Sequence, residues 1–369
     1  MTLKVGITVL NDKLDVNKEN GTTVRVKRLY EVLKPYDNVV LISGGYKNKT
    51  LENLVAVYVP RARYSALLPF WMLGLVNILI RNKFDLIICS SDWFGFLVCY
   101  SLSKLLGFDI VFEAHGILSE ENRIFGKPRM ILKFCQLLER FVISHSKLVI
   151  ALSENIWAFY RRYNKSIEVV PAFVDTTYYK RYEEKRKSLR RYYGIPTGAS
   201  LIGLIGPFDT IPNKYFLEFT YRNLHKFDEH IMFMLIGDCS IRKEDERLIY
   251  TGYVKDYVGH LSCLDAVLVP SKDKTSGPLN KIIESMSCSL PVFTTPKGVV
   301  GLDYAENGKN IFVFDENELV EKVNAYVFND GLMRKVSDNA RKTVERHYSK
   351  EVNGKKLLKI FRSITDDNG

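Results

Sequence analysis

The amino-acid sequence predicts an α/β fold of two doubly wound domains. Short apolar, β-branched runs alternate with segments of helical spacing, which is the pattern of parallel sheets covered by helices on both faces. The length of 369 residues exceeds what one ordinary hydrophobic core supports. A stretch rich in Lys, Arg and Glu, from Tyr178 to Tyr193, separates two sets of predicted strands. We therefore expect two Rossmann-like domains that meet near Pro171.

The predicted strands assign residues 1–170 to a first domain and residues 171–346 to a second. The first set is KVGITVL, NVVLIS, LVAVYV, DLIIC, DIVFE, KLVIAL and IEVVP. The second set is LIGLIG, IMFMLIG, LIYTG, DAVLVP, LPVFTT and IFVF. Residues 347–369 form a closing segment and tail, in which apolar residues recur at roughly helical spacing. We expect an amphipathic closing helix there.

The cysteines and the apolar runs predict a cytoplasmic protein without a membrane span. Six cysteines are scattered without CxxC spacing, and most lie in apolar segments, which is typical of reduced core residues. The start MTLKVGITVL lacks the features of a secretory signal and is read as the first strand. The longest apolar run, from Ala66 to Ile80, is shorter than the roughly 20 residues that a spanning helix needs.

The net charge of +11 is concentrated in the first domain. Residues 1–170 hold 23 Lys and Arg against 15 Asp and Glu. Excess positive charge suits nucleic acid, an anionic membrane surface or a phosphorylated substrate, and the alternative is a generally solvated basic surface. No motif of clustered basic and aromatic residues is present, so we expect no nucleic-acid partner.

One segment of the first domain predicts peripheral contact with an anionic membrane. Basic residues flank apolar ones there; the basic residues are Arg61, Arg63, Arg81 and Lys83, and the apolar ones include Leu67, Phe70, Trp71 and Leu75. Such a combination can dock on an anionic leaflet. The alternative is an internal helix of the first domain.

The segment from Ser276 to Leu302 joins a polar helix start to a buried strand and a glycine loop. Ser276 is predicted to be the N-cap, with Gly277 in the first turn. Lys281 and Glu284 lie three residues apart on the polar side, where they can address one ligand near the positive helix end. The alternative is an ordinary surface ion pair. The strand LPVFTT then ends at a loop whose glycines, Gly298 and Gly301, allow backbone amides to approach a ligand.

Other strand ends add candidate residues. His115 follows DIVFE at the carboxyl edge of the first sheet, although a lone histidine is more often structural. Gly21 precedes the helix VRVKRLYEVL, whose first amides can face a phosphate. In the second domain the candidates are two glycines at strand ends, a cation in reach of an anion, and an aromatic able to meet a flat base or to pack in its loop: Gly206, Gly237, Lys214 and Tyr253.

Several motif classes are absent from the sequence. It contains no GxGxxG, Walker A or HExxH motif, no recognisable Ser/His/Asp set and no clustered metal ligands. We therefore expect neither a bound cofactor nor a metal.

Together these motifs resemble the family-four, group-one retaining glycosyltransferases of the GT-B fold. SGPLNKIIESMSCSLPVFTTPKGVVGL is similar to a branch whose pattern is SG, three residues, Lys, two residues, Glu, then AMACGLPVV and a glycine loop. LIGPFDTIPN, MLIGD and YTGYVKDYVGHLSCLDAVLVPS resemble its donor domain, and FEAHGI, ALSEN and VVPAFVD resemble its first domain. The resemblance spans most of the chain.

The resemblance implies a metal-independent, hexosyltransferase-type enzyme with two domains facing across a cleft and a closing helix packed back on the first. It would transfer a sugar, with retention, from a nucleoside-diphosphate sugar to a glycan or lipid-linked acceptor. The second domain would bind the donor and the first the acceptor. The alternative is a catalytically silent relative that binds a nucleotide or glycan as a partner subunit, because Pro207 follows Gly206 where the family usually has arginine and lysine nearby.

The resemblance also implies roles for individual residues. Glu284 would hold the ribose hydroxyls, Lys281 the diphosphate, and His115 would lie against the transferred sugar. The remaining donor contacts would be made at the base and through backbone amides by Tyr253, Val254, Gly277, Gly298 and Val299. Ser276 stands where the family's first glutamate would be. Ser289 replaces a helix-end glycine, at a position where left-handed backbone would be strained.

Overall fold

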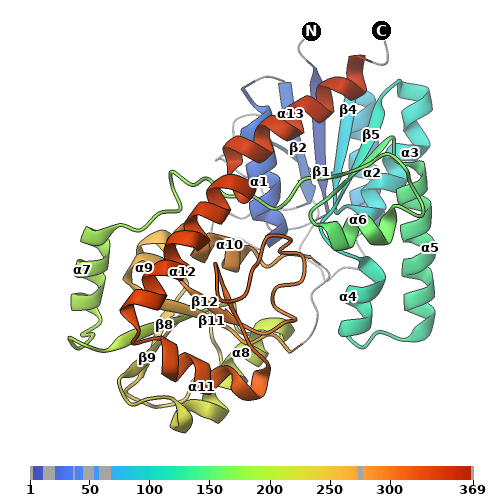
Figure 1. Ribbon diagram of the computed structural model, residues 1–369. Helices are drawn as coiled ribbons and strands as arrows, with labels where there is room; N and C mark the ends of the chain where they lie inside the picture. The colour runs from blue at the N-terminus through green and yellow to red at the C-terminus, as the bar shows by residue number, and fades with distance from the viewer. Residues whose placement is uncertain are drawn as a thin grey trace. The chain divides into compact units, whose positions relative to one another are not determined.

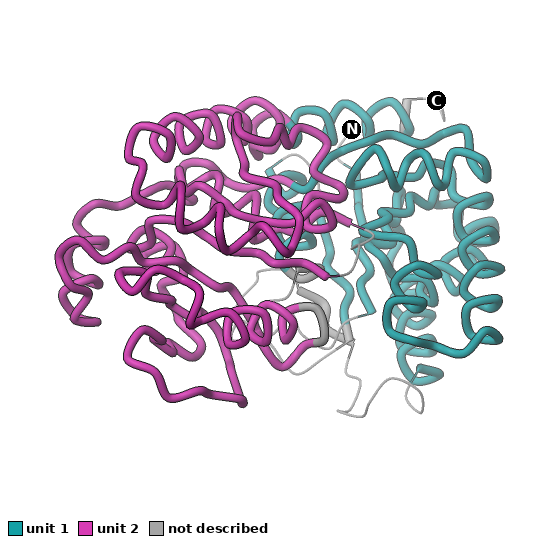
Figure 2. Tube along the Cα trace, turned by 60° about the horizontal axis from the view of Figure 1, so that its bottom comes forward, with its two compact units in different colours: residues 1–172, 353–369 teal, residues 173–352 magenta. Residues whose placement is uncertain are grey.

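The computed structural model describes residues 3–10, 21–35, 38–44, 54–57, 68–272 and 277–366. It divides into two compact units (Figure 2). Unit 1 comprises Met1–Ala172 and Asn353–Gly369, and unit 2 comprises Phe173–Val352. Each unit is an α/β domain with one sheet, so the predicted fold class is confirmed.

The described part of unit 1 has a seven-stranded parallel sheet with the order β3-β2-β1-β4-β5-β6-β7 (Figure 1). The strands are β1 (Lys4–Val9), β2 (Asn38–Gly44), β3 (Leu54–Val57), β4 (Leu86–Ser90), β5 (Asp109–Ala114), β6 (Leu148–Ala151) and β7 (Ile167–Val169). The helices are α1 (Gly21–Leu33), α2 (Leu68–Arg81), α3 (Trp93–Leu106), α4 (Leu118–Ile124), α5 (Arg129–His145) and α6 (Glu154–Tyr160).

The described part of unit 2 has a six-stranded parallel sheet with the order β10-β9-β8-β11-β12-β13. The strands are β8 (Ser200–Ile205), β9 (Ile231–Ile236), β10 (Leu248–Gly252), β11 (Ala266–Val269), β12 (Val292–Thr294) and β13 (Phe312–Val313). The helices are α7 (Glu183–Tyr192), α8 (Ile211–Asn223), α9 (Tyr257–Cys263), α10 (Asn280–Ser287), α11 (Glu316–Tyr326) and α12 (Asp330–Thr343), with a 3₁₀ turn at Leu224–Lys226 and a π turn at Val344–Tyr348. The last helix, α13 (Lys350–Asp366), begins in unit 2 and continues in unit 1. Every strand predicted from the sequence is present.

Both sheets reverse their strand order at one point. In unit 1 the reversal lies between β1 and β4, and in unit 2 it lies between β8 and β11. In open parallel sheets, ligands bind beside the carboxyl ends of the strands at such a switch point. The loops after β1, β4, β5, β8 and β11 are therefore the positions at which a site is expected.

The core of unit 1 buries one face of the predicted membrane segment. Trp71 and Leu75 are both 0% exposed and pack in the main apolar cluster of the unit, while Phe70 is 60% exposed. The alternative, an internal helix, is therefore correct for the buried face of α2. Its periodicity matched both interpretations because an apolar stripe is the same whether it meets a sheet or a bilayer. Arg61, Arg63 and Leu67 lie outside the described residues.

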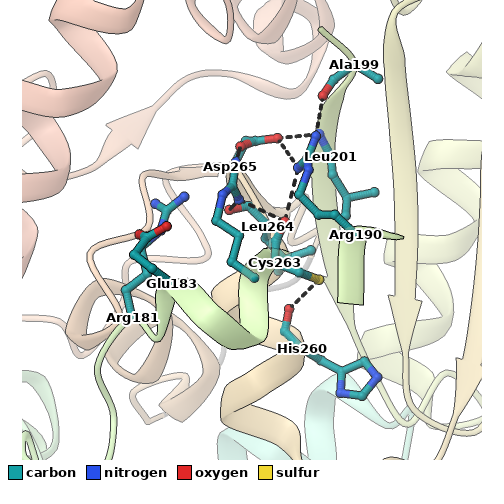
Figure 3. A network of polar contacts seen from close by, with 10 residues as sticks. Arg181, Glu183, Arg190, Ala199, Leu201, His260, Cys263, Leu264 and Asp265 are labelled. Carbon is teal, nitrogen blue, oxygen red and sulfur yellow. Dashed lines mark hydrogen bonds and ion pairs between the residues drawn. The ribbon is translucent and has the colours of Figure 1, made fainter. Parts of the chain in front are cut away.

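The charged helix α7 buries no side chain. Ion pairs and hydrogen bonds hold it in place instead. Asp265 accepts hydrogen bonds from Arg186 at 2.6 Å and from Arg190 at 2.9 Å, and Figure 3 shows Arg190 beside this carboxylate. The two guanidinium groups also donate to the carbonyl oxygen of Cys263, at 2.9 and 3.1 Å. Carbonyl groups at the end of a helix carry partial negative charge, so these arginines stabilise the end of α9. The network therefore joins α7 to the end of α9 and to Asp265, the residue before β11.

The closing helix α13 belongs to unit 1 from Asn353 onward. The carbonyl oxygen of Ile364 accepts a hydrogen bond from Lys147 at 3.1 Å, and Leu357 is fully buried. A Cβ added at Gly354 would lie 3.2 Å from Val32, so the helix closely approaches α1. The helix packs on the first domain as the resemblance implied.

All six cysteines are free thiols.

Candidate functional site

The ammonium of Lys281, in the first turn of α10, is bound to two acceptors near the end of β8. It donates to the carbonyl oxygen of Ile205 at 2.6 Å and to Oδ1 of Asn213 at 2.7 Å, and it lies 4.7 Å from the centre of the Phe216 ring. An ammonium has three N–H groups, so one is left without a partner among the described residues. Burial lowers the pKa of Lys281 to about 7, although Glu284 opposes the shift.

Glu284 lies on the next turn of α10 and is only 7% exposed. The hydroxyl of Tyr257 donates to its Oε2 at 3.3 Å. Burial, followed by the neighbouring carboxylate, raises the pKa of Tyr257 well above its ordinary range, so the phenol keeps its proton and acts as the donor. Lys281 and Glu284 are thus held by partners on other elements, and the predicted alternative of an ordinary surface ion pair is wrong.

The start of α10 differs from the prediction. The helix begins at Asn280 with Leu279 as its N-cap, so Gly277 and Pro278 precede the helix. The predicted N-cap role of Ser276 is therefore incorrect, and Ser276 itself lies outside the described residues. The sequence favoured Ser276 because a serine before an apolar stripe is a strong capping signal. Here one more residue, Leu279, follows Pro278 before the regular helix starts.

Asn213 was not among the predicted site residues. Its Oδ1 accepts from Lys281, and its Nδ2 donates to the carbonyl oxygen of Pro207 at 2.9 Å. It therefore joins the turn after β8 to α10. The Pro-Asn pair at the start of α8 was the signal that could have identified it. Lys214, the predicted residue next to it, is exposed and lies 3.8 Å from Glu218 on the surface of α8.

Two glycines permit close backbone approach around this cluster. Gly237, after β9, has a φ of +123°, and a Cβ there would lie 3.3 Å from the Cα of Gly206. Gly301 has a φ of +82°, and a Cβ there would lie 2.9 Å from the backbone nitrogen of Pro278. Such positions exclude a side chain. The glycine loop after β12 therefore lies directly against the chain that leads into α10.

The other predicted residues of unit 2 occupy loops at the carboxyl ends of strands. Gly298 is buried after β12, and a Cβ there would lie 2.1 Å from Oγ1 of Thr294. Val299 is half-buried in the same turn. Tyr253 is 47% exposed after β10, and the adjacent Val254 is half-buried. Nearly half of Tyr253 is therefore accessible to solvent, which is more than the predicted alternative, a tyrosine packed in its loop, would leave exposed.

In unit 1, His115 belongs to a buried network at the carboxyl ends of β4 and β5. Its Nε2 lies 2.9 Å from Oε2 of Glu113 and 3.0 Å from Oγ of Ser90. Glu113 also accepts from Nε of Arg25 on α1, at 2.8 Å. Burial alone would raise the pKa of Glu113, but Arg25, His115 and Ser90 together lower it to about 2. Glu113 is therefore ionised, and Nε2 of His115 carries the proton that it accepts.

The chain after β4 is strained beside this network. Ser91 has a φ of +52°, a left-handed conformation that non-glycine residues rarely adopt, and its N–H donates to the carbonyl oxygen of Glu113 at 2.9 Å. The next residue, Asp92, caps α3 by accepting from the N–H of Gly95 at 2.7 Å, and burial raises its pKa to about 6. Strain of this kind is concentrated at functional sites.

Gly21 is the first residue of α1, so the helix begins three residues before the predicted start at Val24. The α1 residue with a described contact to the His115 network is Arg25. Neither Arg25 nor Glu113 was predicted as a site residue. A buried Arg–Glu pair 88 residues apart has no local signature in the sequence.

Family models match both halves of the chain. Residues 20–178 match Glycosyltransferase Family 4, and residues 200–329 match Glycosyl transferases group 1. The chain belongs to the family-four, group-one glycosyltransferases. In this glycosyltransferase, the His115 network lies within the first matched region, and Lys281 and Glu284 lie within the second. A sequence search among curated proteins finds no match.

Solved structures share the GT-B fold of this glycosyltransferase. HepE from Anabaena, in complex with UDP and glucose, has a TM-score of 0.76 at 16% identity and covers 98% of this chain and 100% of its own. Sucrose-phosphate synthase from Thermosynechococcus elongatus has a TM-score of 0.80 at 14% identity, with 99% and 100% covered. WaaG, a glycosyltransferase involved in lipopolysaccharide biosynthesis, has a TM-score of 0.72 at 14% identity, with 95% and 98% covered.

Two searches of the described residues complete the description of this glycosyltransferase. No three His, Cys, Asp or Glu side chains in the described ranges lie close enough together to hold a metal ion. No helix in the same ranges is both long enough and apolar enough to cross a bilayer.

Proposed function

We propose that this protein transfers a sugar, with retention and without a metal, from a nucleoside-diphosphate sugar to a glycan or lipid-linked acceptor. The observation that carries the proposal is the buried placement of Lys281 and Glu284 on α10, each held by hydrogen bonds from distant elements. Membership of the family supports glycosyl transfer. HepE, which shares the fold, was solved with UDP-glucose, and this supports a nucleotide sugar as the donor.

Lys281 is the proposed diphosphate contact. Negative charge gathers on the leaving diphosphate in the transition state, and a fixed cation stabilises that charge without reorganisation. Two of the three N–H groups of the ammonium bind Ile205 and Asn213, which aims the third. Glu284 is the proposed acceptor for the ribose hydroxyls, with Tyr257 fixing its carboxylate. Lys281 and Glu284 thus divide phosphate and ribose recognition between two turns of one helix.

Backbone and loop residues complete the proposed donor site. Amides beside strand-end glycines would contact phosphate or sugar, and the loop after β10 would border the base. The residues assigned to these contacts are Gly21, Gly206, Gly237, Gly277, Gly298, Val299, Tyr253 and Val254. Lys214 and Ser276 keep their proposed assignment as donor-site residues.

In unit 1 we assign the contact with the transferred sugar to His115. Because Nε2 donates to Glu113, a neutral imidazole presents the lone pair of Nδ1, which can accept from a sugar hydroxyl. Retention would follow from a front-face displacement. The bond from the anomeric carbon to the diphosphate oxygen breaks, the acceptor oxygen bonds to the same face, and the leaving phosphate takes the acceptor's proton. We place the reaction in the cytoplasm, which the free thiols support.

The donor assignment is tested by thermal unfolding with a panel of UDP-, GDP- and ADP-sugars. The correct donor raises the melting temperature because it binds only the folded protein. Lys281→Ala and Glu284→Ala should each weaken that shift, while Glu318→Ala, an exposed carboxylate on α11, should not. Unchanged donor affinity in both site variants would remove the proposal. NMR of the product's anomeric proton tests retention, and activity in the presence of a chelator tests metal independence.

A silent, nucleotide- or glycan-binding relative remains the competing function. The feature that favours it is the chain after β8, where Pro207 follows Gly206 and Lys214 pairs with Glu218 on the surface. Transfer or donor hydrolysis by purified protein, abolished by Glu284→Ala, would exclude it. Donor binding without either reaction would favour it over the enzyme.

A further inference from the structure

Helix α5 of unit 1 exposes a stripe of large apolar side chains. Its inner face is buried in the unit, but Met130, Phe134 and Leu137 are 83%, 54% and 68% exposed. Spacings of four and three residues place these three on one face of the helix. Ile131, on the same helix, is 42% exposed, and Phe125, which caps the end of α4, is 46% exposed. We call the four α5 residues the outer face of α5.

The charges around the outer face of α5 are positive. In residues 118–145, all of which are described, every charged side chain in the exposed class is basic: Arg123, Lys127, Arg129, Lys133 and Arg140. Glu120 and Glu121 are half-buried, and Glu139 points inward, where its Oε1 accepts from the N–H of Ser119 at 2.9 Å. Lys133 and Arg140 are seven residues apart, so they flank the stripe along one side.

We propose that the outer face of α5 docks this protein on an anionic lipid surface. A helix that combines exposed apolar side chains with flanking cations lies in the interface plane, with the apolar residues among acyl chains and the cations at anionic headgroups. Each Lys or Arg near such a surface contributes about 1 kcal/mol. Burial among acyl chains stabilises the Met, Leu and Ile side chains, whereas the phosphates of a nucleic acid offer them no apolar contact.

A second copy of the chain fits this face less well than a lipid surface. A symmetric dimer presents the same patch on both partners, so the basic residues of one copy would face those of the other. Like charges brought together across an interface oppose association. The exposed basic residues therefore favour a binding partner of negative charge, and the apolar stripe favours a partner with a hydrocarbon interior.

The docking helix is connected to the His115 loop within unit 1. Oε1 of Glu139 lies 2.9 Å from the hydroxyl of Tyr160, and that hydroxyl lies 3.3 Å from the carbonyl oxygen of Gly116. Gly116 follows His115 directly, and Figure 1 shows α4 and α5 in the chain that continues from it. Docking would therefore hold His115 at a set depth from the headgroups. This step rests on the proposed function and favours a lipid-linked acceptor over a soluble one.

The test is sedimentation of the full chain with vesicles of phosphatidylcholine alone and of phosphatidylcholine mixed with phosphatidylglycerol. We expect binding to the anionic vesicles at low salt, weakened by added salt. The double variants Phe134→Glu/Leu137→Glu and Lys133→Glu/Arg140→Glu should each lose about tenfold or more in binding. The matched controls are Phe328→Glu and Lys335→Glu, exposed residues of unit 2, and should bind as the unchanged protein does.

Specific results would overturn the docking proposal. They are failure to sediment with anionic vesicles at low salt, equal loss in the unit 2 controls, or a dimer in solution that Phe134→Glu/Leu137→Glu dissociates. Thermal unfolding of each variant shows that it is folded, and the donor-induced shift in melting temperature reports the proposed function separately. Vesicle binding without any donor shift would leave the docking surface standing and remove the enzyme proposal. A donor shift without vesicle binding would do the reverse.

Discussion

The hydroxyl oxygen of Tyr257 lies 3.3 Å from Oε2 of Glu284, and the carboxylate is only 7% exposed. Tyr257 begins α9, and Glu284 lies on α10, 27 residues later. Because burial keeps this phenol protonated, it is a permanent donor to the carboxylate. Tyr257 is thus a positioning residue for the proposed ribose contact.

Replacing Tyr257 by Phe should weaken donor binding and leave turnover nearly unchanged. Loss of a hydrogen bond to a charged acceptor costs about 1.5 kcal/mol, which is roughly a tenfold rise in the donor dissociation constant. Calorimetric titration measures the affinity, and steady-state kinetics separates KM from kcat. Tyr182→Phe, which removes an exposed hydroxyl bonded to the carbonyl of Tyr178, is the matched control. A loss confined to kcat would contradict the positioning role.

Donor binding should be coupled to uptake of a proton by Lys281. Its folded-state pKa is lowered to about 7, so the side chain is mostly neutral at pH 8, and a bound diphosphate would restore the charge. The donor dissociation constant should therefore rise by up to about tenfold for each pH unit above 7. Calorimetry at pH 8 in two buffers of different ionisation enthalpy measures the uptake, which Lys281→Met should abolish and Lys335→Met, at an exposed lysine of α12, should retain. Equal heats in both buffers would refute the coupling.

The same shift predicts how Lys281 affects folding stability. The pKa of a Lys in the unfolded chain is near 10.5, so between pH 7 and 10.5 the unfolded state binds more protons than the folded state. The free energy of unfolding therefore gains from this residue as pH rises through that window. Lys281→Met should remove this part of the pH dependence in urea titrations of the ligand-free protein.

Glu113→Gln should destabilise unit 1 strongly. The substitution removes the buried carboxylate that pairs with Arg25, and breaking a buried pair costs about 3 kcal/mol or more. The folded pKa of Glu113 is about 2, below its usual 4.5, so its contribution is complete above pH 4.5 and is lost as pH falls toward 2. Urea unfolding at pH 7 and at pH 3 measures both effects. Glu168→Gln, an exposed carboxyl on β7, should change neither value.

Ser289→Gly should raise the stability of unit 2. Ser289 follows α10 with a φ of +55°, the left-handed conformation that the sequence predicted as strained. That conformation costs a residue with a side chain about 1 to 2 kcal/mol. Glycine removes this cost but increases the entropy of the unfolded chain, which offsets part of the gain in stability. We expect a net gain of about 0.5 to 1 kcal/mol in thermal or urea unfolding. Ser289→Ala keeps the Cβ, so an equal gain from alanine would show that strain is not the cause.

The strands could be predicted from the sequence because their signal is local. A buried parallel strand is a short, continuous apolar run, and each such run became one of β1 to β13. Ser289 was predictable for the same reason, since the helix end and the required backbone conformation lie within a few residues of each other. The start of α10 was predicted three residues too early because a serine before an apolar stripe is a strong capping signal, whereas the helix begins only after Leu279.

Contacts between distant segments were not predictable. Lys281 binds Ile205 and Asn213, which precede it by 76 and 68 residues, and these contacts turn an apparent surface pair into a buried cluster. Trp71 faces the core because the sheet of unit 1 covers it. A helix's periodicity shows which residues share a face and does not show what covers that face.

The sequence by itself determined the α/β class, the two sets of strands, the helical closing segment and the candidate positions at strand ends. Local composition, period and turn chemistry carry all of these within about ten residues. Only the tertiary structure decided that Arg25 ionises Glu113 next to His115, that Asn213 aims Lys281, and that α5 exposes a stripe of large apolar side chains. Burial and hydrogen bonding between segments tens of residues apart set these properties, and neither exists until the chain has folded.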